Sequence, residues 1–155
     1  MQHQPPPPEW PQISASLFYR DPAAAIAWLC KAFEFEVKIK VEGQDGSIVH
    51  SELVYGQGLI MVAGAARPGM GFEPGQEYRR LFASPLDLEH RHNQAMFIYV
   101  DDVEVHHARA LEHGAKVFMA LTTNDYGPDY WTDRSYGAYD CEGHLWWFSQ
   151  RLRTG

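Results

Sequence analysis

The sequence predicts an α+β fold of two βαβββ modules, whose curved mixed sheets surround a cavity and whose helices lie outside. Three observations predict it. Residues 15–42 align without a gap with residues 95–122. In both copies an apolar strand is followed by an acidic helix cap, a helix and a second strand, and two further strand patterns then complete the unit. A repeat of this length with strands of its own is too long for a solenoid unit, so it indicates a duplicated supersecondary module.

The first module is predicted at residues 13–64. It follows an N-terminal arm, residues 1–12, in which four consecutive prolines predict an extended polyproline segment. After a strand at 13–19, Asp21 and Pro22 mark a helix start, because Asp accepts hydrogen bonds from free amides and Pro fits the first turn. Helical spacing then defines a buried face of Ile26, Leu29, Cys30 and Phe33. Three strands follow, at 35–41, 48–55 and 59–63; the first alternates strictly and is expected to be half-buried.

The second module is predicted at residues 94–150, after a glycine- and proline-rich connection at 65–93. That connection is long enough to cover a site or to reach a partner subunit. A strand at 95–100 leads to Asp101-Asp102, which cap a helix at 103–113, and Gly114 ends the helix. Further strands are predicted at 116–121, 131–139 and 144–150. A polar loop is predicted at 122–130, and the tail, 151–155, is expected to fray.

The bulk composition excludes several classes of function. Apolar residues make up 45% of the chain and the net charge is −7, with no basic stripe, so nucleic acid and anionic membranes are not expected partners. No apolar run approaches the roughly 20 residues that span a bilayer, and the N-terminus lacks a signal-peptide pattern. Cys30 and Cys141 do not make a disulfide framework. We therefore expect a reduced, cytoplasmic protein.

Two motifs, one at the start and one near the end of the second module, carry a resemblance to a known family. Tyr99-Val100-Asp101-Asp102 opens the second module, and Asp140-Cys141-Glu142-Gly143-His144-Leu145-Trp146 lies near its end. With the two modules, they resemble the glyoxalase/bleomycin-resistance/dioxygenase superfamily, which has the vicinal oxygen chelate fold. The stretches 50–53, 59–61 and 143–146 resemble its PhnB-like branch. The resemblance covers residues 13–150 and implies a homodimer. It does not select a reaction, because the superfamily includes isomerases, dioxygenases, thiol transferases and drug-sequestering proteins.

The metal-dependent members of that family place His or Glu ligands at equivalent strand positions, and the sequence departs from this pattern. A catalytic metal needs three or four such groups together. The corresponding positions here hold neither imidazole nor carboxylate: they are Ser14 or Ala15, Ile60 or Met61, Gln94 or Ala95, and Trp147. The sequence therefore predicts no metal and no other cofactor.

The remaining polar candidates are histidines and one glutamate. His50 and Glu52 share one face of a strand, so they are either an acid–base or ligand pair in the cavity, or a polar stripe on a half-exposed strand or dimer seam. His92 precedes the strand at 95–100 and lies within reach of a cavity rim. His106, His107 and His113 are expected on a solvated helix face.

Aromatic side chains gather in the strands and loops that are expected to surround the cavity. Five of them are predicted to line it: Tyr19, Tyr99, Trp131, Trp146 and Trp147. Of the last two, which are adjacent, one faces the cavity and the other the helices. Aromatic walls suit flat apolar or cationic ligands, and the acidic net charge favours a cation. These residues fill the core in the competing interpretation, because aromatic residues dominate cores as well as pockets.

Three functions follow from these patterns. The first is a metal-independent protein that binds or sequesters a small aromatic molecule without making bonds. The second is a lyase, isomerase or dioxygenase that uses His50, Glu52 and His92 in an unusual metal or acid–base site. The third is a structural or regulatory dimer with filled, vestigial cavities. The sequence favours binding over catalysis.

Overall fold

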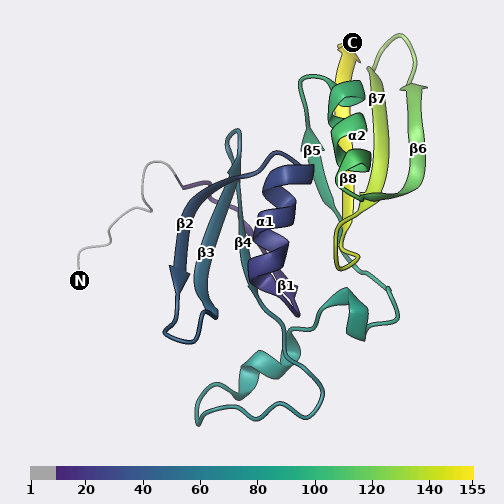
Figure 1. Cartoon of the computed structure of the whole chain (residues 1–155). Helices are drawn as coiled ribbons and strands as arrows, with labels where there is room; N and C mark the ends of the chain where they lie inside the picture. Colours follow the sequence, from purple (N-terminus) through teal and green to yellow (C-terminus); the bar gives the residue numbers. More distant parts are fainter. Residues whose placement is uncertain (1–9) are drawn as a thin grey trace, which may run out of the picture.

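The computed structural model describes residues 10–155 and contains two four-stranded mixed sheets, each with one helix (Figure 1). Residues 1–9 of the predicted arm lie outside the described residues. The elements are β1 (Ala15–Tyr19), α1 (Pro22–Ala32), β2 (Glu36–Glu42), β3 (Ile48–Tyr55), β4 (Gly58–Gly64), the 3-10 helices η1 (Glu77–Leu81) and η2 (Pro85–Asp87), β5 (Met96–Tyr99), α2 (Val103–Glu112), β6 (Lys116–Asp125), β7 (Thr132–Tyr139) and β8 (Leu145–Arg153).

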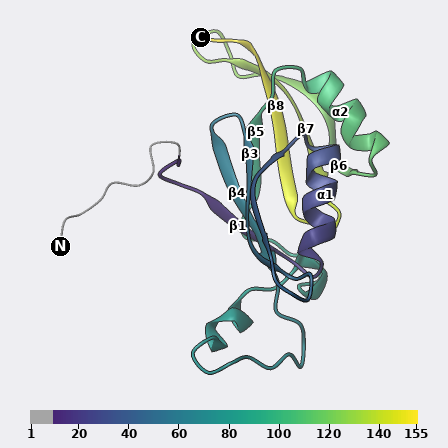
Figure 2. The same ribbon diagram turned by 60° about the vertical axis from the view of Figure 1, so that its left-hand side comes forward.

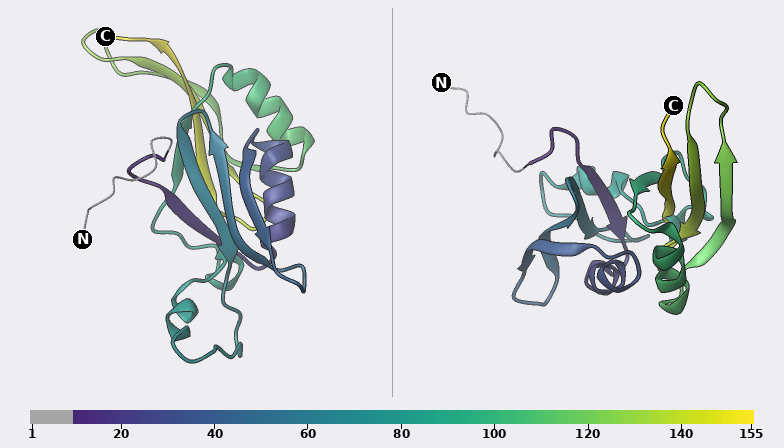
Figure 3. Two further views of the ribbon diagram at one scale, coloured as in Figure 1. Left: turned by 90° about the vertical axis from the view of Figure 1, so that its left-hand side faces the viewer. Right: turned by 90° about the horizontal axis from the view of Figure 1, so that it is seen from above.

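The sheets repeat one topology, β1-β4-β3-β2 and β5-β8-β7-β6, and in each the first strand pairs in parallel with the last. Figure 3 shows α1 and α2 side by side, on the same side of both sheets. The connection between the modules projects away from the sheets at one end of the molecule (Figure 2). The predicted α+β fold with two βαβββ modules is therefore confirmed.

Both helices start at the predicted carboxylates. Asp21 accepts a hydrogen bond from the amide of Ala24 at 3.0 Å, and Asp102 accepts from Glu104 and Val105 at 3.1 and 3.0 Å. Gly114 follows α2 with a φ of 89°, a conformation that glycine adopts without a Cβ penalty. Local sequence therefore fixes both helix starts and the end of α2.

The two modules share one core. Phe33, directly after α1, packs on Trp146 and Phe148 of β8 with ring centroids 5.5 and 4.7 Å apart. The Trp28 indole of α1 donates to the carbonyl of His113, after α2, at 2.8 Å. All three packed rings, Phe33, Trp146 and Phe148, are fully buried. Because side chains of one module complete the interior of the other, neither half has a closed core of its own.

The turn between β7 and β8 fastens the modules together. Asp140 Oδ2 accepts from the Tyr19 hydroxyl at 2.6 Å and from the Trp146 indole at 3.0 Å. Its Oδ1 accepts from the backbone amides of residues 142, 143 and 144. Glu142 accepts from the amides of residues 20 and 21 and from the Ser84 hydroxyl. Residues 140–144, which carried the family resemblance, thus join both modules and the connection.

The structure corrects the ends of two strands. β6 runs through Asp125, where a polar loop was predicted, and β8 runs through Arg153, where a frayed tail was predicted. Both ends pair with β7, and Arg153 Nη2 lies 2.9 Å from Asp125 Oδ1. The residues at these ends are polar, so apolar periodicity did not detect them; their pairing depends on partners distant in the sequence.

Two predictions about burial were wrong. The strictly alternating strand β2 is exposed along its whole length, including Val37, Ile39 and Val41, because it lies at the edge of its sheet. His106 is 1% exposed rather than solvated. Its Nε2 donates to the carbonyl of Phe33 at 3.5 Å, and its Nδ1 accepts from the Tyr136 hydroxyl at 2.7 Å. Burial lowers the pKa of this imidazole.

No helix among residues 10–155 is long and apolar enough to cross a membrane. Cys30 is half-buried beside the core and Cys141 is exposed; both thiols are free.

Candidate ligand-binding face

The face of the second sheet that points away from the helices presents aromatic side chains in ordered rows. Trp146 and Phe148 of β8 point toward the helices and are fully buried, so Trp147, Ser149 and Arg151 point the other way. Strand register places Phe97, Trp147 and Gly137 in one row, Tyr99, Ser149 and Ser135 in the next, and Arg151 beside Asp133 in a third. We call Phe97, Tyr99, Phe118, Trp131, Asp133, Trp147 and Arg151 the aromatic face.

Arg151 is the centre of a polar group on this face. Its guanidinium carbon lies 5.2 Å from the centroid of the Tyr99 ring and 5.0 Å from that of Trp131. Nε donates to Asp133 Oδ1 at 2.5 Å, one Nη donates to the Tyr99 hydroxyl, and that hydroxyl donates to Asp133 Oδ2 at 3.3 Å. Hydrogen bonding to Asp133 raises the pKa of Arg151, so the cation is held in place.

The group is both fixed and accessible. Asp133 is 5% exposed, whereas about a third of the Arg151 side chain is reached by solvent (32%). The contacts to Asp133 and Tyr99 use two of the five N–H groups of the guanidinium within the described chain. A buried carboxylate thus positions a cation whose other donors remain available to a ligand.

A second group on the same face is apolar. The ring of Phe118 meets the edge of Trp147 at 5.1 Å and lies equally close to Tyr139. Phe118 occupies the space over Gly137, where an added Cβ would come within 2.4 Å of the ring. The absence of a side chain at residue 137 therefore lets the Phe118 ring pack over this strand beside Trp147.

Three of the five aromatic residues predicted to line a cavity belong to this face: Tyr99, Trp131 and Trp147. The other two do not. Tyr19 and Trp146 are fully buried on the helix side of their sheets, and both donate to Asp140. They point inward because strand alternation places them with Leu17 and Phe148, against the helices. Of the tryptophan pair, Trp147 faces outward and Trp146 faces the helices.

The three predicted catalytic candidates lie apart from the aromatic face. His50 and Glu52 are on the open side of the first sheet, with Nε2 2.8 Å from Oε1. Glu52 is 3% exposed, and its Oε2 is buried with no partner in the part of the chain that the structure describes. His92 lies in the connection, its ring centroid 6.4 Å from that of His144. The structure therefore joins His50 to Glu52 and separates His92 from them.

The central residues of the face, Asp133 and Arg151, were not predicted. Arg151 had been assigned to the tail, and Asp133 to an ordinary strand position. One pattern in the sequence could have identified Arg151. The alternation of Leu145, Trp147, Ser149 and Arg151 extends the last strand beyond residue 150 and predicts that Arg151 lies on the same face as Trp147. Nothing local identifies Asp133, whose partner lies 18 residues away on the neighbouring strand.

The donor groups present do not fit a metal of the family's kind. Within residues 10–155, no group of three or more His, Cys, Asp or Glu side chains is arranged to hold a metal ion. At the position of the expected glutamate ligand, Trp147 points onto the aromatic face, and Ile60 is buried in the core. Aromatic and aliphatic groups therefore stand where such a site needs carboxylate or imidazole.

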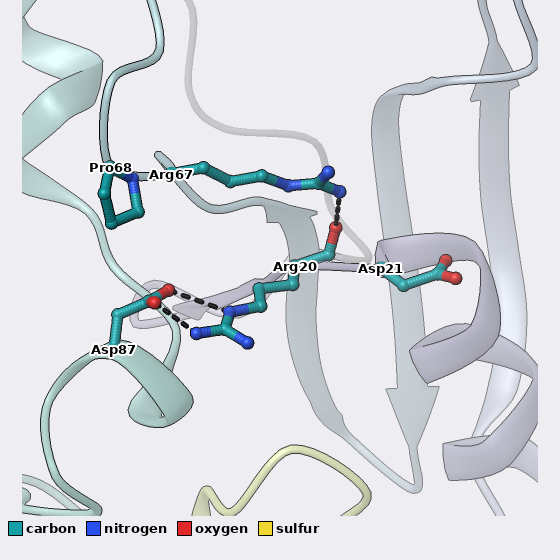
Figure 4. A pocket seen from close by; sticks show the side chains of 5 residues that line it. All are labelled: Arg20, Asp21, Arg67, Pro68 and Asp87. Carbon is teal, nitrogen blue, oxygen red and sulfur yellow. Dashed lines mark hydrogen bonds and ion pairs between the residues drawn. The ribbon is translucent and has the colours of Figure 1, made fainter.

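Two hollows lie away from the aromatic face. One, of about 400 Å³, is lined by Arg20, Asp21, Arg67, Pro68 and Asp87. Figure 4 shows that Arg20 reaches across it to Asp87, while Arg67 donates to the carbonyl of Arg20 at 2.7 Å. These contacts fasten the connection to the first module. The other hollow, of about 160 Å³, lies between β1, the connection and the start of β8.

Comparison with known proteins agrees with this architecture. An uncharacterized protein of Mycobacterium bovis is 29% identical over 143 residues, which cover 92% of this chain and 85% of the relative. Among solved structures, TioX from Micromonospora sp. ML1 has a TM-score of 0.63 and 26% identity, over 90% of this chain and 95% of TioX. TnmS3, an antibiotic binding protein from Streptomyces sp. CB03234, shares the fold with a TM-score of 0.58 and 14% identity, over 89% and 93% of the two chains.

A model of the Glyoxalase/Bleomycin resistance protein/Dioxygenase superfamily matches residues 12–148, nearly the whole described chain. The match spans both βαβββ modules and the connection between them. The chain belongs to the glyoxalase/bleomycin resistance protein/dioxygenase superfamily.

Proposed function

We propose that this protein binds a flat aromatic small molecule on the aromatic face, without a metal and without making bonds. One observation carries the proposal: a solvent-accessible Arg151 is held by buried Asp133 beside the rings of Tyr99 and Trp131. Such a group offers stacking surface and directed hydrogen bonds at one place. The antibiotic-binding relative TnmS3, which has the same fold, is consistent with it. The stretches 50–53, 59–61 and 143–146 place the chain, in our proposal, in the PhnB-like branch.

The ligand we propose carries a hydrogen-bond acceptor, such as a carboxylate, phenolate or carbonyl, on its ring. The rings best placed for a cation, Tyr99 and Trp131, already lie against Arg151. A cationic ligand would approach that guanidinium and be repelled, despite the acidic net charge of the whole chain. An acceptor on the ligand instead meets the unused N–H groups of Arg151.

Binding should weaken when either the guanidinium of Arg151 or the ring of Trp131 is removed. We expect 2-naphthoate to quench the tryptophan fluorescence, and 2-naphthylmethylammonium to bind more weakly. Arg151→Met and Trp131→Ala should each raise the Kd of 2-naphthoate about tenfold, the equivalent of about 1.4 kcal/mol for a lost charged hydrogen bond or stacking contact. Isothermal titration calorimetry measures the change.

Arg134→Met is the matched control, because Arg134 is a neighbour on β7 that points to the helix side and pairs with Glu104. It should leave the Kd unchanged. Equal affinities in the wild type and in Arg151→Met would contradict the proposed site. Failure of every flat aromatic probe to bind would favour a structural or regulatory dimer.

We also propose that two copies of the chain pair, so that each aromatic face becomes one wall of a pocket between the partners that stays open to a ligand. Large apolar side chains are exposed on the open side of both sheets, with Ile39 and Val41 on β2 and Phe97, Tyr99 and Phe118 on the second sheet. In a single chain these faces are exposed to solvent. In a twofold pair, the first sheet of one chain would face the second sheet of its partner, and the reverse contact would form as well.

Sedimentation equilibrium should give twice the chain mass of 17.7 kDa. Ile39→Lys should shift the protein toward the monomer, because it buries a charge in the interface. Val105→Lys, at an exposed position on α2, should leave the mass unchanged. A wild-type protein that remains monomeric at every concentration would contradict the pairing.

A second candidate function is acid–base catalysis at His50 and Glu52, which the 2.8 Å contact between Nε2 of His50 and Oε1 of the buried Glu52 favours. The exposed imidazole of His50 is the group that a molecule on this side of the sheet would meet, and Glu52 would orient it. Recovery of the bound molecule separates the two functions. Binding alone returns it unchanged and survives a chelator, whereas catalysis at this pair returns a product that disappears in Glu52→Gln.

A further inference from the structure

The aromatic face extends well beyond Arg151, along β8 toward its first residues. Its rows follow the strand: Arg151 belongs to the third row, Tyr99 to the second, and Phe97 and Trp147 to the first. Two residues along a strand span about 6.6 Å, so the two outer rows are about 13 Å apart. A ligand of one ring that bonds to Arg151 would therefore leave the first row uncovered.

Accessible rings connect the guanidinium to the first row. The guanidinium carbon of Arg151 lies 5.2 Å from the centroid of Tyr99, and that centroid lies 5.3 Å from the centroid of Phe97. Phe97 and Tyr99 are 55% and 50% exposed. Phe118, which meets the edge of Trp147, is 37% exposed. A bound molecule can thus reach a cation and then a series of rings in one direction along the sheet.

On its two central strands, the second row holds polar groups that are already paired. The side chains there are Ser135 on β7 and Ser149 on β8, and their Oγ atoms lie 2.7 Å apart. They are only 8% and 0% exposed, so the hydroxyls bond to each other and not to solvent. The Tyr99 hydroxyl is likewise engaged, with Asp133 and Arg151. The part of a ligand that crosses this row should therefore be apolar.

We infer that the aromatic face takes an elongated aryl carboxylate, with two aromatic rings in line and the acid group at one end. The carboxylate bonds to Arg151, the first ring lies over the second row, and the second ring contacts the first row. One charge at the end of an apolar body matches a face with a fixed cation at one end and exposed rings at the other. The site is the one proposed above, so the inference rests on the proposed function and adds the length and polarity of the ligand.

An NMR titration of the ¹⁵N-labelled full chain with benzoate, biphenyl-4-carboxylate and the bent biphenyl-3-carboxylate tests the inference. We expect biphenyl-4-carboxylate to bind at least about tenfold more tightly than benzoate, the equivalent of one more ring contact. The bent isomer, whose second ring leaves the line of the rows, should gain less than about threefold. The indole N–H signal of Trp131 should shift with every acid, and that of Trp147 only with biphenyl-4-carboxylate.

One variant and a matched control locate the second ring. Phe118→Ala should reduce the tenfold gain to less than about threefold and leave the Kd of benzoate unchanged, because it removes a contact in the first row only. Tyr78→Ala removes an exposed ring on the connection, away from the aromatic face, and should change neither Kd. If Phe118→Ala does not fold, Phe97→Ala tests the same row.

Three results separate failure of this inference from failure of the proposed function. Equal affinities for benzoate and biphenyl-4-carboxylate, or for the two biphenyl isomers, would overturn the elongated ligand. The proposed function would stand in that case if Arg151→Met still weakens the binding of benzoate. A Kd of benzoate that Arg151→Met leaves unchanged would contradict the proposed site itself, and the absence of binding by all three acids up to their solubility limits would contradict both.

Discussion

Replacing Asp140 with Ala should lower the free energy of unfolding by about 4 kcal/mol, because a buried network loses the acceptor on which all its donors converge. The carboxylate is 6% exposed and accepts from the Tyr19 hydroxyl, the Trp146 indole and three backbone amides. The substitution removes the acceptor of the Tyr19 hydroxyl, of the Trp146 indole and of the amides of residues 142 and 144. The amide of residue 143 still donates to the backbone carbonyl of residue 140. The substitution also separates Tyr19 of the first module from Trp146 of the second.

Urea unfolding followed by tryptophan fluorescence measures the loss. Asp129→Ala, at an exposed position in the loop after β6, is the matched control and should change the stability by less than about 0.5 kcal/mol. A loss below about 1 kcal/mol for Asp140→Ala would mean that water replaces the carboxylate, and that the turn does not hold the modules together.

Replacing His106 with Ala should cost about 3 kcal/mol at neutral pH, from a cavity in the core and an orphaned hydroxyl. The ring packs on Phe148 with centroids 4.2 Å apart and accepts the hydrogen bond of Tyr136. His107, the next residue on α2 and only half-buried, provides the control: His107→Ala should cost less than about 1 kcal/mol.

His106 should also make the protein sensitive to acid. Burial lowers its pKa in the folded state, whereas the unfolded chain has the ordinary value of about 6.5. Below that pH the unfolded state binds more protons than the folded state. The contribution of His106 to the free energy of unfolding is therefore complete above about pH 6.5 and declines as the pH falls toward the pKa of His106 in the folded state. The difference in unfolding free energy between wild type and His106→Ala should therefore shrink from pH 7 to pH 5. A constant difference over that range would contradict a neutral, buried His106.

The fold was predictable because its signals are local. Asp21 and Asp102 cap helices in both repeats, and the apolar spacing from Ile26 to Phe33 selects the face of α1 that packs inward. The helix caps and the apolar spacing each depend on residues only a few positions apart in the sequence, so they do not require tertiary contacts. The strand ends at Asp125 and Arg153 were missed for the opposite reason, since they are polar and exist only through pairing with β7.

The candidate site was predictable only in part. The sequence identified Tyr99, Trp131 and Trp147, but it grouped them with Tyr19 and Trp146, which the structure buries against the helices. The presence of an aromatic residue does not show whether it lines a ligand-binding site or lies in the core, because aromatic residues are common in both. The sequence also placed His106 on a solvated face, although Phe33 and Phe148 enclose it.

By itself, then, the sequence determined two βαβββ modules, their caps and turns, and aromatic rings on the strands. These follow from periodicity and capping, which act over a few residues. Only the tertiary structure decided that Arg151 lies against Tyr99 and Trp131 beside Asp133, and that Asp140 joins the modules. The physical reason is that each of these arrangements depends on strand register and on packing between residues far apart in the chain, which no local pattern records.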